Sequence, residues 1–167
     1  DGFTYEPGAA IGVLPENDPA LAADVARAVG LDGDASLVLK IARGYDITTL
    51  SRATVDAYAK LTGRKDVAKL TDAEALAKFS ADRQLVDLLS EYAEKLTAEQ
   101  LLGLLRPLPG RLYSVASSVK AHPGEAHLLI GAVRWASHGR RRGGVASTYF
   151  ADRRKVGDKV RVYVKPN

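Results

Sequence analysis

The stretch PLPGRLYSVASS, residues 107–118, lies where the sequence changes from one structural pattern to another. Before it, from residue 15 to residue 106, apolar residues recur at helical spacing. After it, β-favouring residues follow a period of two. The stretch therefore predicts the end of a helix-rich block and the start of β structure. Strands are predicted over 111–115, 126–135 and 159–164, and a short helix over 145–154.

The N-terminal end also has β character. Residues 1–14 are predicted to be extended, with Ile11, Val13 and Leu14 around Gly12. A short β segment, a helical block and further β segments do not form a repeat. Because barrel strands far apart in sequence can still pair, an interrupted β-barrel explains this order most simply. We expect an α+β fold, with a barrel in 1–14 and 107–167 and a helical insertion in 15–106.

Capping signals mark helix ends within the block. Asp18 before Pro19 predicts a helix start, and Gly30 predicts its end. Thr97 and Gln100 fit a capping box. A helix is also predicted over 49–61 and is ended by Gly63. Thr71 and Glu74 fit another capping box, and Ser80 or Asp82 is predicted to start a further helix.

The composition is that of a globular protein. The 167 residues are 46% hydrophobic and include no Cys and no Met. A chain of this length can bury a core without disulfides, and the lack of Cys excludes cysteine nucleophiles, iron–sulfur clusters and Cys-based zinc sites. No apolar stretch approaches the roughly 20 residues of a membrane span, so a cytoplasmic protein is expected. Because the first residue is Asp1, the chain is expected to belong to a longer polypeptide.

Positive charge is concentrated near the C-terminal end. The net charge is +4, but Arg134 to Lys165 contains ten basic residues against Asp152 and Asp158. This segment predicts an anionic partner such as a nucleotide cofactor, a nucleic acid or an acidic protein. A solvated basic surface without a ligand is the alternative. The run Arg140 to Arg142 lacks interleaved aromatic residues, which disfavours a nucleic-acid-binding module.

The sequence lacks the motifs of several common catalytic and binding sites. The three histidines, His122, His127 and His138, do not have the spacing of a zinc protease, so no metal site is predicted. The sequence contains no GxGxxG, P-loop or GxSxG motif. No side chain is expected to act as a covalent nucleophile.

Two clusters near the predicted strands remain. On a strand, Arg111 and Tyr113 would share one face and Ser114 the other, and these side chains suit a phosphate, an aromatic ring and a ring heteroatom. Residues 144–147, Gly-Val-Ala-Ser, open the predicted helix, whose free N–H groups favour an anion. Together the clusters predict a pocket for a ligand with an aromatic ring and a diphosphate.

The motifs RLYS (111–114), GAVRW (131–135) and GVASTYFADR (144–153), in this order, resemble the FAD-binding region of the diflavin reductases. The stretches 5–21 and 104–114 extend the resemblance over nearly the whole chain. The PENDPAL opening (15–21) and the RLYSxASS signature (111–118) are most similar to the sulfite reductase flavoproteins of that family. The resemblance implies a ferredoxin-reductase-like FAD barrel interrupted by a mostly helical connecting domain.

The resemblance also implies roles for individual residues. Arg111 is expected to clamp the FAD pyrophosphate, Tyr113 to stack on the isoalloxazine and Ser114 to hydrogen-bond near N5. Leu112 of the same strand is also expected to bind the cofactor. The pyrophosphate is expected to lie on the helix start formed by Gly144, Val145, Ala146 and Ser147. Leu129, Ile130 and Gly131 are expected to face the cofactor, although Leu129 and Ile130 could instead belong to the barrel core. Trp135 is expected to contact the nucleotide part of FAD, and Thr48 to contact FAD from the connecting domain.

In such a reductase, electrons pass from NADPH through FAD to FMN and then to a metalloprotein. The resemblance implies an FMN-binding flavodoxin-like domain and an NADP-binding domain in the same polypeptide, with a haemoprotein acceptor such as the sulfite reductase beta component. The chain alone is expected to lack NADPH-driven activity. The alternative within this chemistry is a cytochrome P450 reductase-like or another fused diflavin reductase.

Overall fold

The computed structural model describes residues 4–167, so the first three residues of the predicted extended segment lie outside the described residues. The chain divides into two compact units. Unit 1 contains the segment ending at Glu16, Pro109–Arg134 and Gly143–Asn167. Unit 2 contains Asn17–Leu108 and Trp135–Arg142. No helix within residues 4–167 combines the length and apolar character needed to cross a lipid bilayer.

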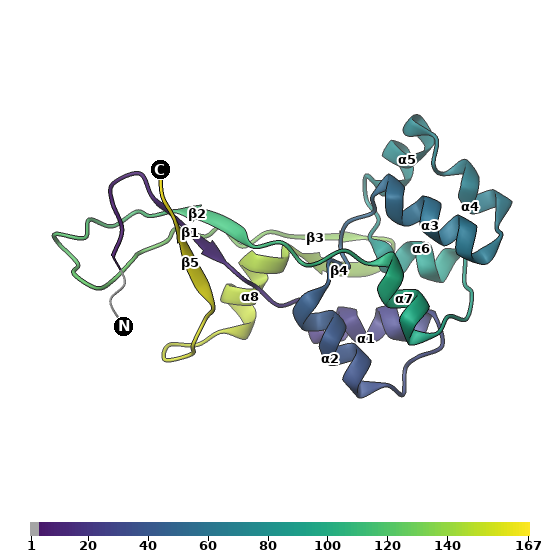
Figure 1. Ribbon diagram of the computed structural model, residues 1–167, viewed down its shortest axis with the longest axis horizontal. Coiled ribbons are helices and arrows are strands. Elements are labelled where there is room, and N and C mark those ends of the chain that lie inside the picture. Colours follow the sequence, from purple (N-terminus) through teal and green to yellow (C-terminus); the bar gives the residue numbers. More distant parts are fainter. Residues whose placement is uncertain (1–3) are drawn as a thin grey trace. The chain divides into compact units, whose positions relative to one another are not determined.

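Unit 2 is a helical body built around an apolar core (Figure 1). Tyr58 is fully buried there, and its hydroxyl donates to the Tyr92 carbonyl at 2.7 Å. Two sets of helices pack together, α1 with α2 and α6, and α3 with α4 and α7. The helices are α1 (Pro19–Ala28), α2 (Ala35–Gly44), α3 (Arg52–Thr62), α4 (Lys65–Lys69), α5 (Ala73–Ser80), α6 (Leu85–Glu91) and α7 (Ala98–Leu104).

Several predicted helix ends are confirmed. The Asp18 side chain accepts a hydrogen bond from the Ala20 N–H at the start of α1, and Gly30 follows this helix with a φ of +79°. Thr97 and Gln100 form the capping box of α7. Gly63 ends α3 in the left-handed conformation, which glycine adopts without steric cost.

Other local predictions were wrong by a few residues. Asp72, not Thr71, caps α5, because the Thr71 hydroxyl instead donates to the Ala68 carbonyl of the preceding helix. Gln84, not Ser80 or Asp82, caps α6. The helix predicted from residue 49 begins at residue 52, after the cap Ser51, and α2 and α4 were not predicted.

Unit 1 contains an antiparallel sheet of β1 (Ala10–Val13), β2 (Arg111–Ser114) and β5 (Val162–Lys165), in the order β2-β1-β5. Helix α8 (Val145–Arg153) belongs to the same unit. At its C-terminal end, Arg153 donates from Nη2 to the Glu16 carbonyl at 2.9 Å, which ties α8 to the chain just after β1.

Strands β3 (Arg134–Ser137) and β4 (Arg140–Gly143) form a separate two-stranded hairpin. Its turn residues, His138 and Gly139, both have positive φ, as tight hairpin turns require. The α+β class is therefore confirmed. The strands within residues 4–167 do not close into a barrel, because β2 and β5 each pair on one side only.

The strand predicted over 126–135 was wrong for most of its length. A strand needs a paired neighbour. Before β3, backbone pairing here consists of the bridge between Val115 and Leu128, a hydrogen bond from the Ala116 N–H to the His127 carbonyl and one from the Gly144 N–H to the Val133 carbonyl. Regular strand structure begins only at Arg134. The predicted strand over 159–164 is displaced to 162–165.

Candidate functional site

Strand β2 places Arg111 and Tyr113 on one face of the sheet. Arg111 lies opposite Val13 and Tyr113 opposite Ile11, and directly paired residues share a face. Arg111 is exposed and Tyr113 is half-buried. Burial raises the pKa of the Tyr113 phenol, although the Arg111 charge acts in the opposite direction. At neutral pH this face therefore offers a cation beside a neutral aromatic ring.

The other face of the sheet carries Leu112 and Ser114, both exposed. Leu112 lies opposite Gly12, which also pairs with Tyr163 of β5. The Tyr163 ring packs against Gly12 so closely that a Cβ added there would lie 2.1 Å from Cζ of the ring. The predicted separation of Ser114 from Arg111 and Tyr113 on opposite faces is confirmed by this register.

The start of α8 has the properties of an anion site. Gly144 is its N-cap and supplies no capping side chain. The N–H groups of Val145, Ala146 and Ser147 occupy the first turn, where a helix provides them with no acceptor. Together with the helix dipole, these groups favour a negatively charged ligand.

The Ser147 hydroxyl has an internal role at this helix start. This hydroxyl accepts a hydrogen bond from the Val133 N–H at 3.2 Å and donates one to the Gly144 carbonyl at 3.2 Å. The Gly144 N–H donates to the Val133 carbonyl at 3.0 Å, and the Thr148 hydroxyl donates to the Gly144 carbonyl at 2.9 Å. Ser147 can therefore offer a ligand its backbone N–H, while its hydroxyl holds the preceding loop.

This packing also explains the glycine at the helix start. A Cβ on Gly144 would lie 2.8 Å from Ser147 Oγ and 3.3 Å from Val133 Cβ. Val133 and Thr148 were missed by the sequence reasoning. Thr148 follows Gly144 by one helical turn, which is a recognisable local signal, whereas nothing near Val133 in the sequence marks its contact with Ser147.

The segment between β2 and α8 contains the predicted contacts Leu129, Ile130 and Gly131. Leu129 is 90% exposed, so the interpretation of this residue as barrel core was wrong. Ile130 is half-buried, and the space around Gly131 is open, with no atom within 4 Å of an added Cβ. Leu129 and Val133 are therefore exposed apolar residues of this segment, and Val133 contacts the start of α8.

Two predicted site residues belong to unit 2, whereas the others belong to unit 1. Thr48 donates from Oγ1 to Asp46 Oδ1 at 3.1 Å, and its N–H donates to the same oxygen at 3.0 Å. Burial raises the pKa of Asp46, but hydrogen bonds from Arg106, Thr49 and Thr48 outweigh this effect and lower it below 3.8. Trp135 lies on β3 and is exposed.

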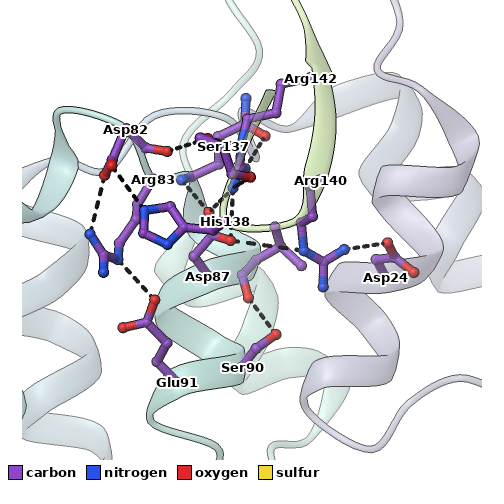
Figure 2. Close-up of polar contacts among 12 residues, drawn as sticks. Asp24, Asp82, Arg83, Asp87, Ser90, Glu91, Ser137, His138, Arg140 and Arg142 are labelled. Carbon is purple, nitrogen blue, oxygen red and sulfur yellow. Dashed lines mark hydrogen bonds and ion pairs between the residues drawn. The ribbon is translucent and has the colours of Figure 1, made fainter. Parts of the chain in front are cut away.

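The basic run on the hairpin is largely committed to contacts within unit 2 (Figure 2). Arg140 Nη1 lies 2.7 Å from Asp24 Oδ2, and Arg142 Nη2 lies 2.9 Å from the Asp87 carboxylate. Arg141 between them is exposed. Arg140 and Arg142 therefore do not form a continuous anion-binding surface with Arg141.

Unit 1 thus combines an arginine, an aromatic ring, an uncapped helix start and exposed apolar side chains. Each of these groups suits one part of an aromatic, anionic ligand.

The chain is similar to proteins described as the flavoprotein alpha-component of NADPH sulfite reductase. It is 42% identical to the protein from Aliivibrio fischeri, 37% to that from Bacillus subtilis and 39% to that from Zymomonas mobilis. Each comparison covers 99% of this chain but only 29% or 30% of the relative. The chain therefore spans less than a third of the length of these curated relatives.

A family model described as the FAD binding domain matches residues 62–149, which is more than half of the chain. The match includes β2, with Arg111 and Tyr113, and the start of α8. The chain therefore belongs to the FAD-binding domain family.

Proposed function

We propose that this chain is the FAD-binding portion of an NADPH-dependent diflavin oxidoreductase that acts in sulfite reduction. The support is the family membership together with the printed names of the relatives. In this proposal, an FMN-binding domain and an NADP-binding domain belong to the same polypeptide. The electron acceptor is a haemoprotein subunit. NADPH-driven turnover requires these additional parts.

The observation that carries the proposal is the shared placement in unit 1 of the RLYS strand and an uncapped helix start. Arg111 would bind the diphosphate, because a guanidinium can donate two hydrogen bonds to it. The N–H groups of Val145, Ala146 and Ser147 would add uncharged donors to the same group. The residues present fit a dinucleotide, since cationic, aromatic and apolar groups are all accessible.

Tyr113 and Ser114 would orient the flavin ring. Tyr113 offers a half-buried flat surface, and Ser114, on the other face at the last position of the strand, offers an exposed hydroxyl to the edge of the ring. When bound, FAD would supply the hydride and single-electron chemistry. The chain's own contribution would be to hold the ring, neutralise the diphosphate and keep the apolar surface at Leu129 and Val133 against the cofactor.

We also propose the domain assignment that this function implies. Residues 1–14 and 107–167 would form part of a ferredoxin-reductase-like FAD barrel, and residues 15–106 a helical connecting domain inserted in it. The bounds of the two compact units support this division up to residue 134 and from residue 143, whereas Trp135–Arg142 belongs to the helical unit. Thr48 and Trp135 belong to unit 2, and their proposed contacts with FAD rest on the resemblance alone.

The proposal is tested by FAD binding to the purified chain. We expect the chain to retain flavin absorbance after desalting or to quench flavin fluorescence on titration. Arg111→Ala should weaken binding by about tenfold or more, because a charge-assisted hydrogen bond contributes about 1.5–3 kcal/mol. Arg141→Ala removes the same charge at an exposed position and serves as the control.

Tyr113→Ala should also weaken binding and change the flavin spectrum, because it removes the stacking surface. Circular dichroism of each variant establishes that the fold is retained. Failure of the folded wild-type chain to bind FAD at any tested concentration would contradict the proposed site. Equal loss of affinity in Arg111→Ala and Arg141→Ala would contradict the role of Arg111.

A further inference from the structure

The loop after β2 brings together two histidines and a glutamate that the proposed flavin site does not use. His122, Glu125 and His127 each offer one ligand atom, and these atoms all lie within 4.8 Å of one another. The two imidazole ring centres are 4.4 Å apart. His127 Nε2 lies 2.9 Å from Glu125 Oε2. In Figure 1 these residues belong to the long green loop between β2 and β3.

A tight turn holds the first two of these residues. The Glu125 N–H donates to the His122 carbonyl at 3.2 Å, and Pro123 and Gly124 lie between them. Gly124 has a φ of +78°. Proline at the second position and a positive-φ glycine at the third are typical of a type II turn. The backbone therefore brings the side chains of His122 and Glu125 close together.

His127 is fixed by separate contacts. Its N–H donates to Ser117 Oγ at 2.9 Å, and its carbonyl accepts from the Ala116 N–H at 2.8 Å. Ser117 Oγ is also 2.8 Å from the Tyr5 hydroxyl. Because the backbone on both sides is held, bringing the three side chains onto one ligand costs less conformational entropy than it would in an unstructured loop.

We propose that His122, Glu125 and His127 form a binding site for a divalent transition-metal ion of the Zn²⁺ class. Two imidazoles and one carboxylate are a ligand set that zinc uses when water occupies its fourth position. The nitrogen ligands distinguish the site from one for Ca²⁺ or Mg²⁺, which prefer oxygen. This site is independent of the proposed flavin function.

The geometry needs only a small adjustment. Ligand atoms about 2.0–2.1 Å from a tetrahedral zinc ion are about 3.3 Å from one another. The ligand atoms lie within 4.8 Å of one another, and rotation of the three exposed side chains can bring them closer. The existing contact between Glu125 and His127 already directs a carboxylate and an imidazole toward the same point. A bound ion would lie between these two groups and join both ends of the turn.

The test is a titration of the untagged full chain with ZnCl₂ in a buffer that does not chelate metals. Calorimetry should detect one ion per chain, with a dissociation constant of about 10 µM or lower. Zn²⁺ should also raise the unfolding temperature, because the ligand binds the folded loop. Co²⁺, added in place of Zn²⁺, should give the visible absorption of a low-symmetry site with nitrogen and oxygen ligands.

His122→Gln and His127→Gln should each weaken Zn²⁺ binding by about tenfold or more, because each removes one of only three protein ligands. The matched control is His138→Gln, which changes the third histidine, in the β3–β4 turn, and should bind Zn²⁺ like the wild-type chain. Absence of saturable binding would overturn the site. The same conclusion would follow if all three variants bound Zn²⁺ equally well.

Discussion

Arg142 donates a hydrogen bond from Nη2 to Asp87 Oδ1 at 2.9 Å, and the two side chains are only 1% and 5% exposed. Arg142 also donates to Gln84 Oε1 at 3.2 Å and to the Ser137 hydroxyl. Figure 2 shows Arg142 of β4 beside Asp87 of α6 and Ser137 of β3. A buried charge that loses its partner is costly, so this pair sets how firmly the hairpin is held within unit 2.

Arg142→Ala should lower the free energy of unfolding by about 3 kcal/mol, because the buried Asp87 would keep only the longer 3.8 Å ion pair with Arg140. Urea unfolding followed by circular dichroism measures the loss. The control is Arg141→Ala, an exposed change that should stay within about 0.5 kcal/mol of the wild-type chain. Similar losses for both variants would contradict the importance of the buried pair.

Gly12→Ala should destabilise the chain by about 1 kcal/mol, because the new methyl group would displace the Tyr163 ring that covers this position. Near-ultraviolet circular dichroism should report the change in the ring environment. In a Tyr163→Ala background, the same glycine change should cost little, since the obstruction has been removed. Additive effects of the two substitutions would show that the ring and Gly12 are not coupled.

Asp46→Asn should destabilise the chain by about 1–3 kcal/mol at pH 7, where the carboxylate accepts hydrogen bonds from Arg106 and Thr48. The folded pKa of Asp46 lies below 3.8, so the stabilisation is complete above the ordinary pKa. It is lost as the pH falls through the lower folded value. The difference between wild type and variant should therefore shrink below about pH 4.

Denaturant midpoints measured between pH 7 and pH 2.5 test this dependence. Asp32→Asn, at an exposed position, changes the formal charge by the same amount and is the control. A difference that grew toward low pH would have the wrong sign and would contradict the assigned role of Asp46.

Asn17→Ala should cost about 1–3 kcal/mol, because the Asn17 side chain closes the C-terminal end of α2. Its Nδ2 donates to the carbonyls of Ile41 and Ala42, both at 3.2 Å, and of Tyr45 at 2.7 Å. Thermal unfolding compares this variant with Asn167→Ala at the exposed end of the chain. Equal stability of the two variants would count against the capping role.

Sequence signals predicted the fold where the physical cause was local. Asp18 and Thr97 cap helices through backbone groups two or three residues away, and both were predicted correctly. Asp82 looked equally suited to a helix start. Its carboxylate instead lies 3.0 Å from His138 Nε2, a partner distant in the sequence. Local spacing cannot reveal such a competing interaction.

The candidate site divides in the same way. The residue types of 111–114 and 144–147 predicted where β2 and α8 begin. The contact between Val133 and Ser147 depends on how the loop before α8 folds back. The types of these two residues therefore could not predict it. Likewise, the run Arg140 to Arg142 carried a clear charge signal, but the folded chain alone reveals that Asp87 neutralises Arg142.

The position of β1 in the middle of its sheet has a consequence for biosynthesis. During translation, β1 leaves the ribosome well before β2 and β5, so its two hydrogen-bonding edges must wait for partners. The helices between β1 and β2 can form in that interval through contacts closer in sequence. This three-stranded sheet is completed only when Val162 reaches Val13, so β1 holds one unpaired edge until β5 has been made.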